Sequence, residues 1–500
     1  MKRGCRRRSF PSLLIFGAIA ASAAWSGGLQ AEMSDDWIDL FDGATLGGWR
    51  ASEHGDTWRV EDGRLVAQGR RSHLFYEGPA GDHDFRNFEL LAEVRTERSC
   101  NAGIFFHTEY QQSVWPSKGY EVQINNTYQG VGNYRELKRT GSLYGVRNIY
   151  QSAAGDGEWS RVRICVVGNR VRVWVDDYPT VDYLQPANCY RKLERAGRIL
   201  SRGTIALQGH DAGSRVAFRR VAIRLLPEGA DPLADKRASD EGYGLTENLM
   251  DRLAGASIPV IDYHIHLRGG MTVEKAMDRQ AVTGINAGVL RNIGQGWPIE
   301  TDDQLREFLD SVRGRPVFVG LQVNDRDWMD RHSPELLARL DYVLGDTMIM
   351  PMPNDDSPPV KLWLADQYTI DDAEAWMQRY MRHNLRVLAE PITILANPTY
   401  LPPPVADLYD KLWTDERMRQ IIQAAIDHHV ALEINGGSKL PSDRFIRLAK
   451  SMGAKFSFGS NNFDDKPISM SRCFAAIEKF GLSKDDIYVP TPKSPVAVGK

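Results

Sequence analysis

The sequence predicts two domains of different class, an all-β sandwich followed by an α/β barrel. Between residues 32 and 226 short apolar strands alternate with turn signals, and no long helical pattern interrupts them. From residue 258 to 493 compact apolar strands alternate instead with amphipathic helical stretches, a pattern typical of a parallel sheet that closes into a barrel. The length of 500 residues also favours two domains, because it exceeds what one ordinary core accommodates.

The overall composition is that of a soluble globular protein without a strong charge bias. Hydrophobic residues make up 42% of the chain and charged residues 25%, and the formal net charge is −3. A near-neutral chain has no general attraction for nucleic acid or for an anionic membrane surface. We therefore expect no nucleic-acid partner.

The first 31 residues have the pattern of a signal peptide. The basic segment MKRGCRRRSF precedes the apolar run PSLLIFGAIAASAA, and small residues follow. This run is short for a membrane-spanning helix, so an uncleaved anchor is the weaker alternative. Cys5 lies before the run, which argues against a lipoprotein. Residues 1–31 therefore predict export to an extracytoplasmic place, periplasmic or secreted, with no stable membrane insertion after the signal is removed.

The remaining cysteines have no metal-site spacing. Cys100, Cys165, Cys189 and Cys473 include no CxxC pair, so a zinc–thiolate site is not indicated. An oxidising compartment permits one disulfide among the first three. Buried free thiols are an equally good interpretation.

The predicted sandwich strands are rich in β-branched and aromatic residues. Turn signals such as EDG, VGN and DDYP separate them. Residues 227–257 are polar and rich in Gly, Asp and Ala, which is typical of a linker, and TENLMDRLAG near its end predicts a short helix. The strands predicted in the sandwich are FELLAEVRT, AGIFFHT, YEVQINN, SRVRICVVG, RVRVWVDD, GTIALQG and VAFRRVAIRLL.

The barrel prediction rests on seven short apolar strands with helices between them. In such a barrel, functional side chains are expected where the strands end and the following loops begin. The strands are IPVIDYHI, NAGVL, PVFVGLQV, YVLGD, ITILA, VALEI and KFSFG, and helical stretches include VEKAMDRQAVTG, SPELLARL, DAEAWMQRYMRHNLRVLA, DERMRQIIQAAIDHH and SDRFIRLAKSMG.

The sandwich resembles the 3-keto-disaccharide hydrolase family. The resemblance rests on WIDLFDGATLGGW, WRVEDGRLVA, RNFELLAEVRT and GTIALQGHDAGSRVAFRRVAIR, which occur in the family's order. It implies a concanavalin-like jelly-roll sandwich that cleaves oxidised glycosides. The ketone at C3 acidifies the proton at C2, so a base can remove it and the C1 leaving group can depart before water adds back.

Polar side chains of the predicted sandwich strands supply candidates for this chemistry. Glu121 and Gln123 alternate along one strand and therefore project from one face. Elimination needs a base for the C2 proton, an acid for the leaving oxygen and a group that stabilises the enolate oxygen. Glu121 or His107 is the candidate base or acid, and Arg219 is the candidate for stabilising the enolate oxygen. The alternative is a carbohydrate-binding module without catalysis. The predicted substrate-binding residues are Asn101, Gln123, Tyr144, Gln208 and His210.

The stretch VIDYHIHL, residues 260–267, predicts a metal site at the first barrel strand. His264 and His266 project from the same face of an extended strand, and Asp262 lies on that face too. Neutral imidazole and carboxylate are good ligands for Zn, Mn or Fe. A satisfied histidine pair is the alternative.

The barrel resembles the PHP (polymerase and histidinol phosphatase) family of metal-dependent barrels. The resemblance rests on IDYHIHL, DYVLGD, ITILANPTYLP and the run from Ala431 to Asn462. Several of the family's ligand positions are neutral here, which disfavours a metal cluster because close cations need anionic ligands. The resemblance therefore implies a degenerate site with one divalent ion; the alternatives are a metal-free pocket that binds a small polyol or sugar and a structural scaffold that presents the sandwich. The predicted ligands of the ion are His264, His266 and Asp346, with Asn397, Glu433 or Asn461 completing the shell.

Together these features predict an exported carbohydrate-active hydrolase or lyase that cleaves 3-keto sugars in its sandwich. One alternative is a carbohydrate-binding sandwich attached to a metal-dependent phosphoesterase-like barrel. Another is a non-enzymatic sugar-binding scaffold, since fold alone does not give function.

Overall fold

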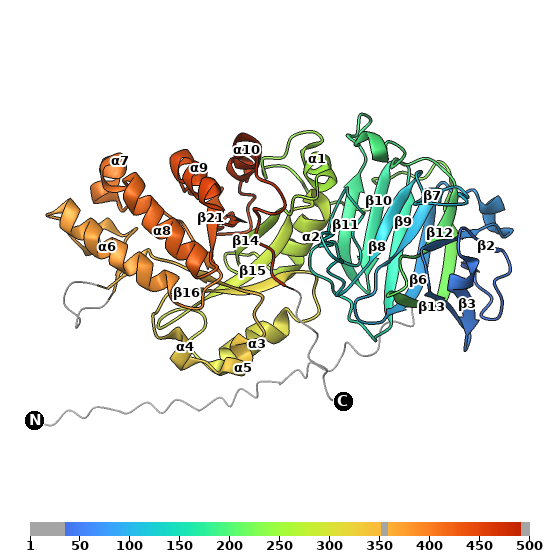
Figure 1. Ribbon diagram of the computed structural model, residues 1–500, viewed down its shortest axis with the longest axis horizontal. Coiled ribbons are helices and arrows are strands. Elements are labelled where there is room, and N and C mark those ends of the chain that lie inside the picture. The colour runs from blue at the N-terminus through green and yellow to red at the C-terminus, as the bar shows by residue number, and fades with distance from the viewer. Residues whose placement is uncertain (1–35, 352–358, 492–500) are drawn as a thin grey trace, which may run out of the picture. The chain divides into compact units, whose positions relative to one another are not determined.

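A computed structural model describes residues 36–351 and 359–491 of the chain. The predicted signal peptide, residues 1–31, lies outside the described residues. Residues from Ile38 onward form one unit that contains both the sandwich and the barrel. The predicted fold class is confirmed: an antiparallel β-sandwich is followed by an α/β region with a closed parallel barrel (Figure 1).

The sandwich consists of two antiparallel sheets. The larger has the strand order β11-β10-β9-β6-β13-β4-β3, with β1 also paired to β13, and the smaller has the order β2-β5-β12-β7-β8. The strands are β1 Ile38–Asp39, β2 Trp49–Ala51, β3 Trp58–Glu61, β4 Arg64–Gln68, β5 Ser72–Tyr76, β6 Phe88–Thr96, β7 Ala102–Thr108, β8 Tyr120–Ile124, β9 Ser160–Val167, β10 Arg170–Val175, β11 Tyr178–Leu184, β12 Thr204–Gly209 and β13 Arg215–Leu225.

The smaller sheet has two chemically different faces. Leu74, Ile104 and Val122 belong to the main apolar core that fills the space between the sheets. Their neighbours along the same strands, among them Phe75 and Phe105, project to the opposite face and form a small separate cluster there. This second face carries the polar side chains of the site described below.

The barrel closes through seven parallel strands in the order β14-β15-β16-β17-β20-β21-β22. All seven strands predicted for the barrel are present, and helices lie around them (Figure 1). A short hairpin of β18 Ile349–Met350 and β19 Val360–Lys361 is added to the loop after β17. The barrel strands are β14 Ile261–His266, β15 Asn286–Ile293, β16 Phe318–Val323, β17 Tyr342–Gly345, β20 Ile394–Leu395, β21 Ala431–Asn435 and β22 Phe456–Gly459.

Ten helices are described in the linker and barrel. Local signals set their starts: the Thr301 hydroxyl and the Gln304 amide form a capping box at α3, and the Asp372 carboxylate accepts two backbone N–H groups at α6. Sequence reasoning missed α3, α4, α7 and α10. The helices are α1 Leu249–Gly255, α2 Val273–Thr283, α3 Asp302–Ser311, α4 Trp328–Arg331, α5 Pro334–Leu337, α6 Ala373–Leu388, α7 Tyr409–Leu412, α8 Asp415–Asp427, α9 Asp443–Met452 and α10 Ser471–Phe480.

The segment after the last sandwich strand is held by hydrogen bonds along its length. The Arg170 guanidinium donates to the carbonyls of Pro232 and Asp235. Asp251 in α1 is buried and accepts from Arg147 and Arg191, both at 2.6 Å. Such fixed contacts distinguish residues 227–257 from a free Gly-rich tether.

Two structural possibilities, a disulfide and a membrane-spanning helix, are not found among the described residues. Cys100, Cys165, Cys189 and Cys473 are all free thiols, so the permitted disulfide does not form among them in this structure. Among the described residues, no helix is both long enough and apolar enough to cross a membrane.

Candidate functional site

Glu121 lies at the centre of a polar cluster on the second face of the smaller sheet. Strand pairing places Phe105 opposite Glu121, and Gly103 opposite both Gln123 and Gln208. The Glu121 side chain is only 8% exposed. It is therefore a carboxyl group held among neighbouring strands rather than a solvated surface charge.

Two partners hold the Glu121 carboxylate. Gln208 Nε2 donates to its Oε1 at 3.0 Å, and Arg198 Nη2 lies 3.7 Å from its Oε2. Burial raises the pKa of Glu121, and the charge of Arg198 offsets this only in part. A carboxylate with a raised pKa is a stronger base than an ordinary glutamate, which suits proton abstraction.

A second polar pair and an aromatic platform lie on the same sheet face. Gln123 Nε2 donates to Asn101 Oδ1 at 2.7 Å, so two predicted binding residues fix each other. The His210 ring nitrogen Nδ1 donates to Asp211 at 2.7 Å. The His210 ring also packs against Trp115, whose exposed fraction is 39%, with 5.1 Å between ring centroids. An exposed indole beside amides is a suitable surface for a sugar ring.

Tyr144 is held by a buried ion pair. Its hydroxyl donates to Glu136 Oε2 at 3.1 Å, and Lys138 Nζ lies 3.1 Å from Glu136 Oε1 and over the Tyr144 ring. Burial alone would raise the pKa of Glu136, but the Lys138 ammonium outweighs it and lowers that pKa. The Tyr144 backbone N–H donates to the Glu121 carbonyl, which places this group next to the central carboxylate.

Sequence reasoning missed Arg198 and His73. Arg198 comes from an irregular loop, where no periodicity marks it. His73 lies on β5 between Phe105 and Trp115, and burial lowers its pKa to about 3. Alternation along the strand SHLFY would have placed His73 and Phe75 on one face.

The structure corrects the placement predicted for His107. Its ring packs against Phe88 and Phe106 of the core. Nε2 donates to the Arg86 carbonyl at 2.9 Å, and Nδ1 accepts from the Ser201 backbone N–H at 3.2 Å. With both nitrogens occupied and its pKa lowered by burial to about 4, His107 is a structural residue and not the predicted base or acid.

The structure also corrects the placement predicted for Arg219. It lies on β13 of the larger sheet, not on the sheet that carries Glu121. Its guanidinium pairs with Glu93 at 2.5 Å and stacks over Trp159. Arg198 is therefore the cation that the fold brings to Glu121.

The barrel gathers a second polar cluster at the carboxyl ends of its strands. His264 Nδ1 donates to Glu433 Oε1 at 2.6 Å, and the Asn397 backbone N–H donates to Glu433 Oε2 at 2.8 Å. Gln322 Nε2 donates to Asp346 at 2.7 Å. All of these side chains are buried.

The ionisation of this cluster is set by burial and by the His264–Glu433 pair. Burial would lower the pKa of His264, but the Glu433 carboxylate outweighs it and raises that pKa. Burial lowers the pKa of His266 well below its ordinary value, and the charge of His264 adds to this effect. Burial raises the pKa of Asp346.

These side chains do not fit the predicted metal ion as they are arranged. Within residues 36–351 and 359–491, no three His, Cys, Asp or Glu side chains gather in a group that could hold a metal. Both Glu433 oxygens are engaged, one by His264 and the other by Asn397 and Asn435. The metal site with Asn461 in its shell therefore stays a prediction, and no chemical step is derived from it.

Asp262 of VIDYHIHL has a structural role. Its Oδ2 accepts from Arg279 at 2.6 Å, and its Oδ1 accepts from the backbone N–H groups of His264 and Ser460. Asp262 thus ties the first barrel strand to the last one and to α2.

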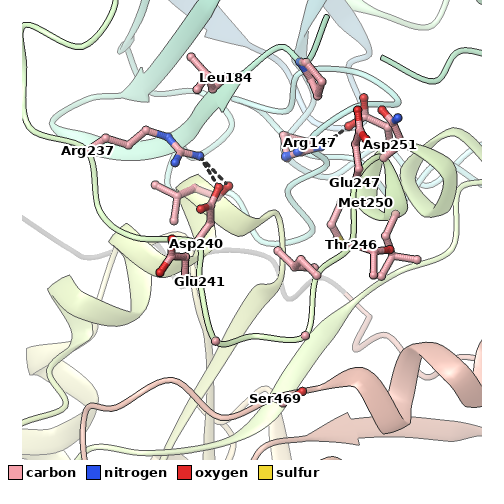
Figure 2. A pocket seen from close by; sticks show the side chains of 17 residues that line it. Arg147, Leu184, Arg237, Asp240, Glu241, Thr246, Glu247, Met250, Asp251 and Ser469 are labelled. Atoms are coloured by element: carbon pink, nitrogen blue, oxygen red, sulfur yellow. Dashed lines mark hydrogen bonds and ion pairs between the residues drawn. The ribbon is translucent and has the colours of Figure 1, made fainter. Parts of the chain in front are cut away.

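A cavity of about 590 Å³ lies along the segment after the sandwich, lined mainly by residues 240–251. Two charged pairs line it: Arg237 donates to Asp240 at 3.0 Å, and Arg147 donates to Asp251, while Glu241 and Glu247 also belong to its walls (Figure 2).

Comparisons with known proteins match the sandwich. Residues 36–224 match the family of 3-keto-alpha-glucoside-1,2-lyase-like domains. Over these residues the sandwich is similar to 3-keto-disaccharide hydrolase domains. A 3-keto-disaccharide hydrolase from Bacteroides thetaiotaomicron is 26% identical over 232 residues, which cover 39% of this chain and 79% of that protein.

Two solved structures are similar to the same part of the chain. A candidate glycosyl hydrolase from Parabacteroides distasonis is 21% identical, with a TM-score of 0.34, and covers 38% of this chain and 94% of its own. A carbohydrate-binding module from Bacillus subtilis is 11% identical, with a TM-score of 0.23, and covers 38% and 95%. The resemblance of the barrel to PHP proteins stays a prediction.

Proposed function

We propose that the sandwich domain cleaves the glycosidic bond of a 3-keto sugar, with Glu121 as the base. The observation that carries this proposal is the cluster of Glu121, Arg198 and Gln208, in which a buried carboxylate lies beside a cation whose side chain is 12% exposed. The family match of residues 36–224 supports the substrate class.

The cleavage would proceed by elimination followed by addition of water. The Glu121 carboxylate takes the C2 proton, and the electron pair moves toward the C3 oxygen, which becomes an enolate. Arg198 stabilises that negative charge, because a fixed cation in a water-poor site interacts strongly with a developing oxyanion. The bond from C1 to its leaving oxygen then breaks.

His210 is suited to protonate the leaving group. Asp211 holds its Nδ1, so Nε2 is the nitrogen left to exchange a proton with substrate. Water then adds to C1 of the unsaturated ketone: its oxygen bonds to C1 while His210 Nε2 takes one of its protons, and Glu121 returns its proton to C2. The net reaction is hydrolysis, and every group of the enzyme is restored.

The second candidate function is sugar binding without turnover. Trp115 favours it, since an exposed indole packed against His210 can stack on a sugar whether or not a bond is cleaved. The alternative of a metal-dependent phosphoesterase-like barrel is less supported, because the described side chains gather no metal-holding group.

Replacement of Glu121 by Gln tests the proposal. We expect Glu121→Gln to lower kcat for a 3-keto glucoside by roughly 10²-fold or more, the usual effect of losing a general base, with little change in KM. The control is Glu93→Gln, a carboxylate of the other sheet that pairs with Arg219. Unchanged turnover in Glu121→Gln would reject the role of Glu121. Sugar binding without turnover by the wild-type protein would favour the second function.

The place of action is part of the same proposal. We infer extracytoplasmic action from the signal-peptide pattern of residues 1–31. Detection of the mature amino terminus in the periplasmic or secreted fraction would test it.

A further inference from the structure

The carboxyl-terminal mouth of the barrel carries a polar side chain from every strand. β14 supplies His264 and His266, and β21 supplies Glu433 and Asn435. The other five strands contribute a residue within them or just after them. These are Asn292 from β15, Gln322 and Asn324 from β16, Asp346 after β17, Asn397 after β20 and Asn461 after β22.

The amides of this ring form two hydrogen-bonded groups. Asn292 Nδ2 donates to Gln322 Oε1 and to Asn324 Oδ1, both at 3.0 Å. Gln322 Nε2 in turn donates to Asp346 Oδ2 at 2.7 Å. On the other side Asn435 Nδ2 donates to Asn397 Oδ1 at 3.1 Å. The side chains are therefore fixed in position, as a binding site requires.

Two ring nitrogens at this mouth remain without a partner. His264 Nε2 and His266 Nδ1 are buried and have no hydrogen bond to any described residue. His264 is 0% exposed and His266 is 3% exposed, and their ring centroids are 5.1 Å apart. Buried polar atoms are normally hydrogen-bonded, so two unpartnered nitrogens side by side indicate a missing ligand.

The chemistry of the ring indicates what this ligand is. Each amide offers both a donor and an acceptor, which matches sugar hydroxyls that also do both. His264 Nδ1 lies 2.6 Å from Glu433 Oε1, so these two groups engage each other. The two carboxylates of the ring are already engaged, Glu433 by His264 and Asn397, and Asp346 by Gln322, which leaves neither oriented to hold a metal ion.

We propose that the barrel mouth is a second binding site that takes an uncharged monosaccharide without a metal ion. The hydroxyls of the sugar would pair with the amides of Asn292 and Asn324 and with the free nitrogens of the two histidines. This proposal does not depend on the cleavage activity of the sandwich.

Isothermal titration of the full chain with D-glucose tests the proposal, with D-glucose 6-phosphate as a charged comparison. The titration uses an Arg198→Ala, Trp115→Ala background, so that the sandwich face does not contribute. We expect saturable glucose binding that is at least tenfold tighter than binding of the phosphate ester. Asn292→Ala in the same background should weaken glucose binding about tenfold or more, the effect of losing buried hydrogen bonds.

Controls separate a binding effect from a folding effect. His428→Ala removes an exposed histidine at the end of α8 and should leave glucose affinity unchanged. If Asn292→Ala does not fold, His266→Asn keeps a polar side chain and should show the same loss. The proposal is overturned if glucose does not bind in this background, or if Asn292→Ala and His266→Asn bind it as the parent does. It is also overturned if elemental analysis finds one Zn, Mn or Fe per chain whose removal abolishes binding.

Discussion

Because Gly103 has no side chain, the Glu121 carboxylate has room to lie beside it. Gly103→Ala should therefore disable the sandwich site. A Cβ at this position would lie 2.9 Å from Glu121 Oε1 and 3.2 Å from Glu121 Cγ. Ordinary van der Waals contact begins near 3.4 Å, so the carboxylate must move by roughly 0.5 Å. That movement would weaken its hydrogen bond from Gln208 and change its distance to Arg198.

The expected loss is large in activity and small in stability. A shift of this size at a reacting group costs roughly 10- to 100-fold in rate. Overpacking costs about 1–3 kcal/mol, and the lower entropy of the unfolded alanine chain offsets about 0.4–1 kcal/mol of it. The net loss of unfolding free energy should therefore stay below about 3 kcal/mol, and the variant should fold.

The assay is release of the leaving group from a 3-keto glucoside, measured beside thermal unfolding. Gly229→Ala is the matched control, because a Cβ there meets nothing within 4 Å. Gly103→Ala with turnover within threefold of wild type would refute the argument that Glu121 must hold its present position.

Four further predictions rest on the described contacts. Because the pKa of Glu121 is raised above 4.5 and the base acts when deprotonated, kcat/KM should rise with pH through a midpoint above 4.5, and a midpoint at or below that value would contradict the assignment. The folded state holds the Glu121 proton more tightly than the unfolded state, so this stabilisation is lost as pH rises. In urea unfolding, the stability of Glu121→Gln relative to wild type should therefore increase as pH rises above 4.5. Asp251→Ala should lower the free energy of unfolding in urea by about 3–5 kcal/mol, because it leaves Arg147 and Arg191 without their carboxylate. In the control Asp303→Ala, where the aspartate side chain is 93% exposed, the loss should be less than about 0.5 kcal/mol. Gly459→Ala should destabilise the barrel by about 3 kcal/mol or more, because the added Cβ would lie 2.0 Å from Glu433 Oε1. An unchanged melting temperature would contradict the close approach of β22 to that carboxylate.

Local patterns in the sequence determined the elements and their faces. Strand alternation predicted that Glu121 and Gln123 share a face, and seven apolar runs predicted the seven strands of the closed barrel. The reason is physical: side-chain direction in a strand depends on a period of two residues, which any short stretch displays. The pattern of Asp262, His264 and His266 is equally local, so the sequence alone was enough to detect it.

Tertiary structure alone decided which of these residues meet. His107 projects into packing with Phe88 and Phe106, Arg219 lies on the other sheet, and the loop residue Arg198 reaches Glu121 instead. His264 pairs with Glu433, 169 positions away, and Asp262 pairs with Arg279. Sheet order, loop paths and the partners of buried charges depend on contacts between distant segments, and no local period in the sequence encodes them.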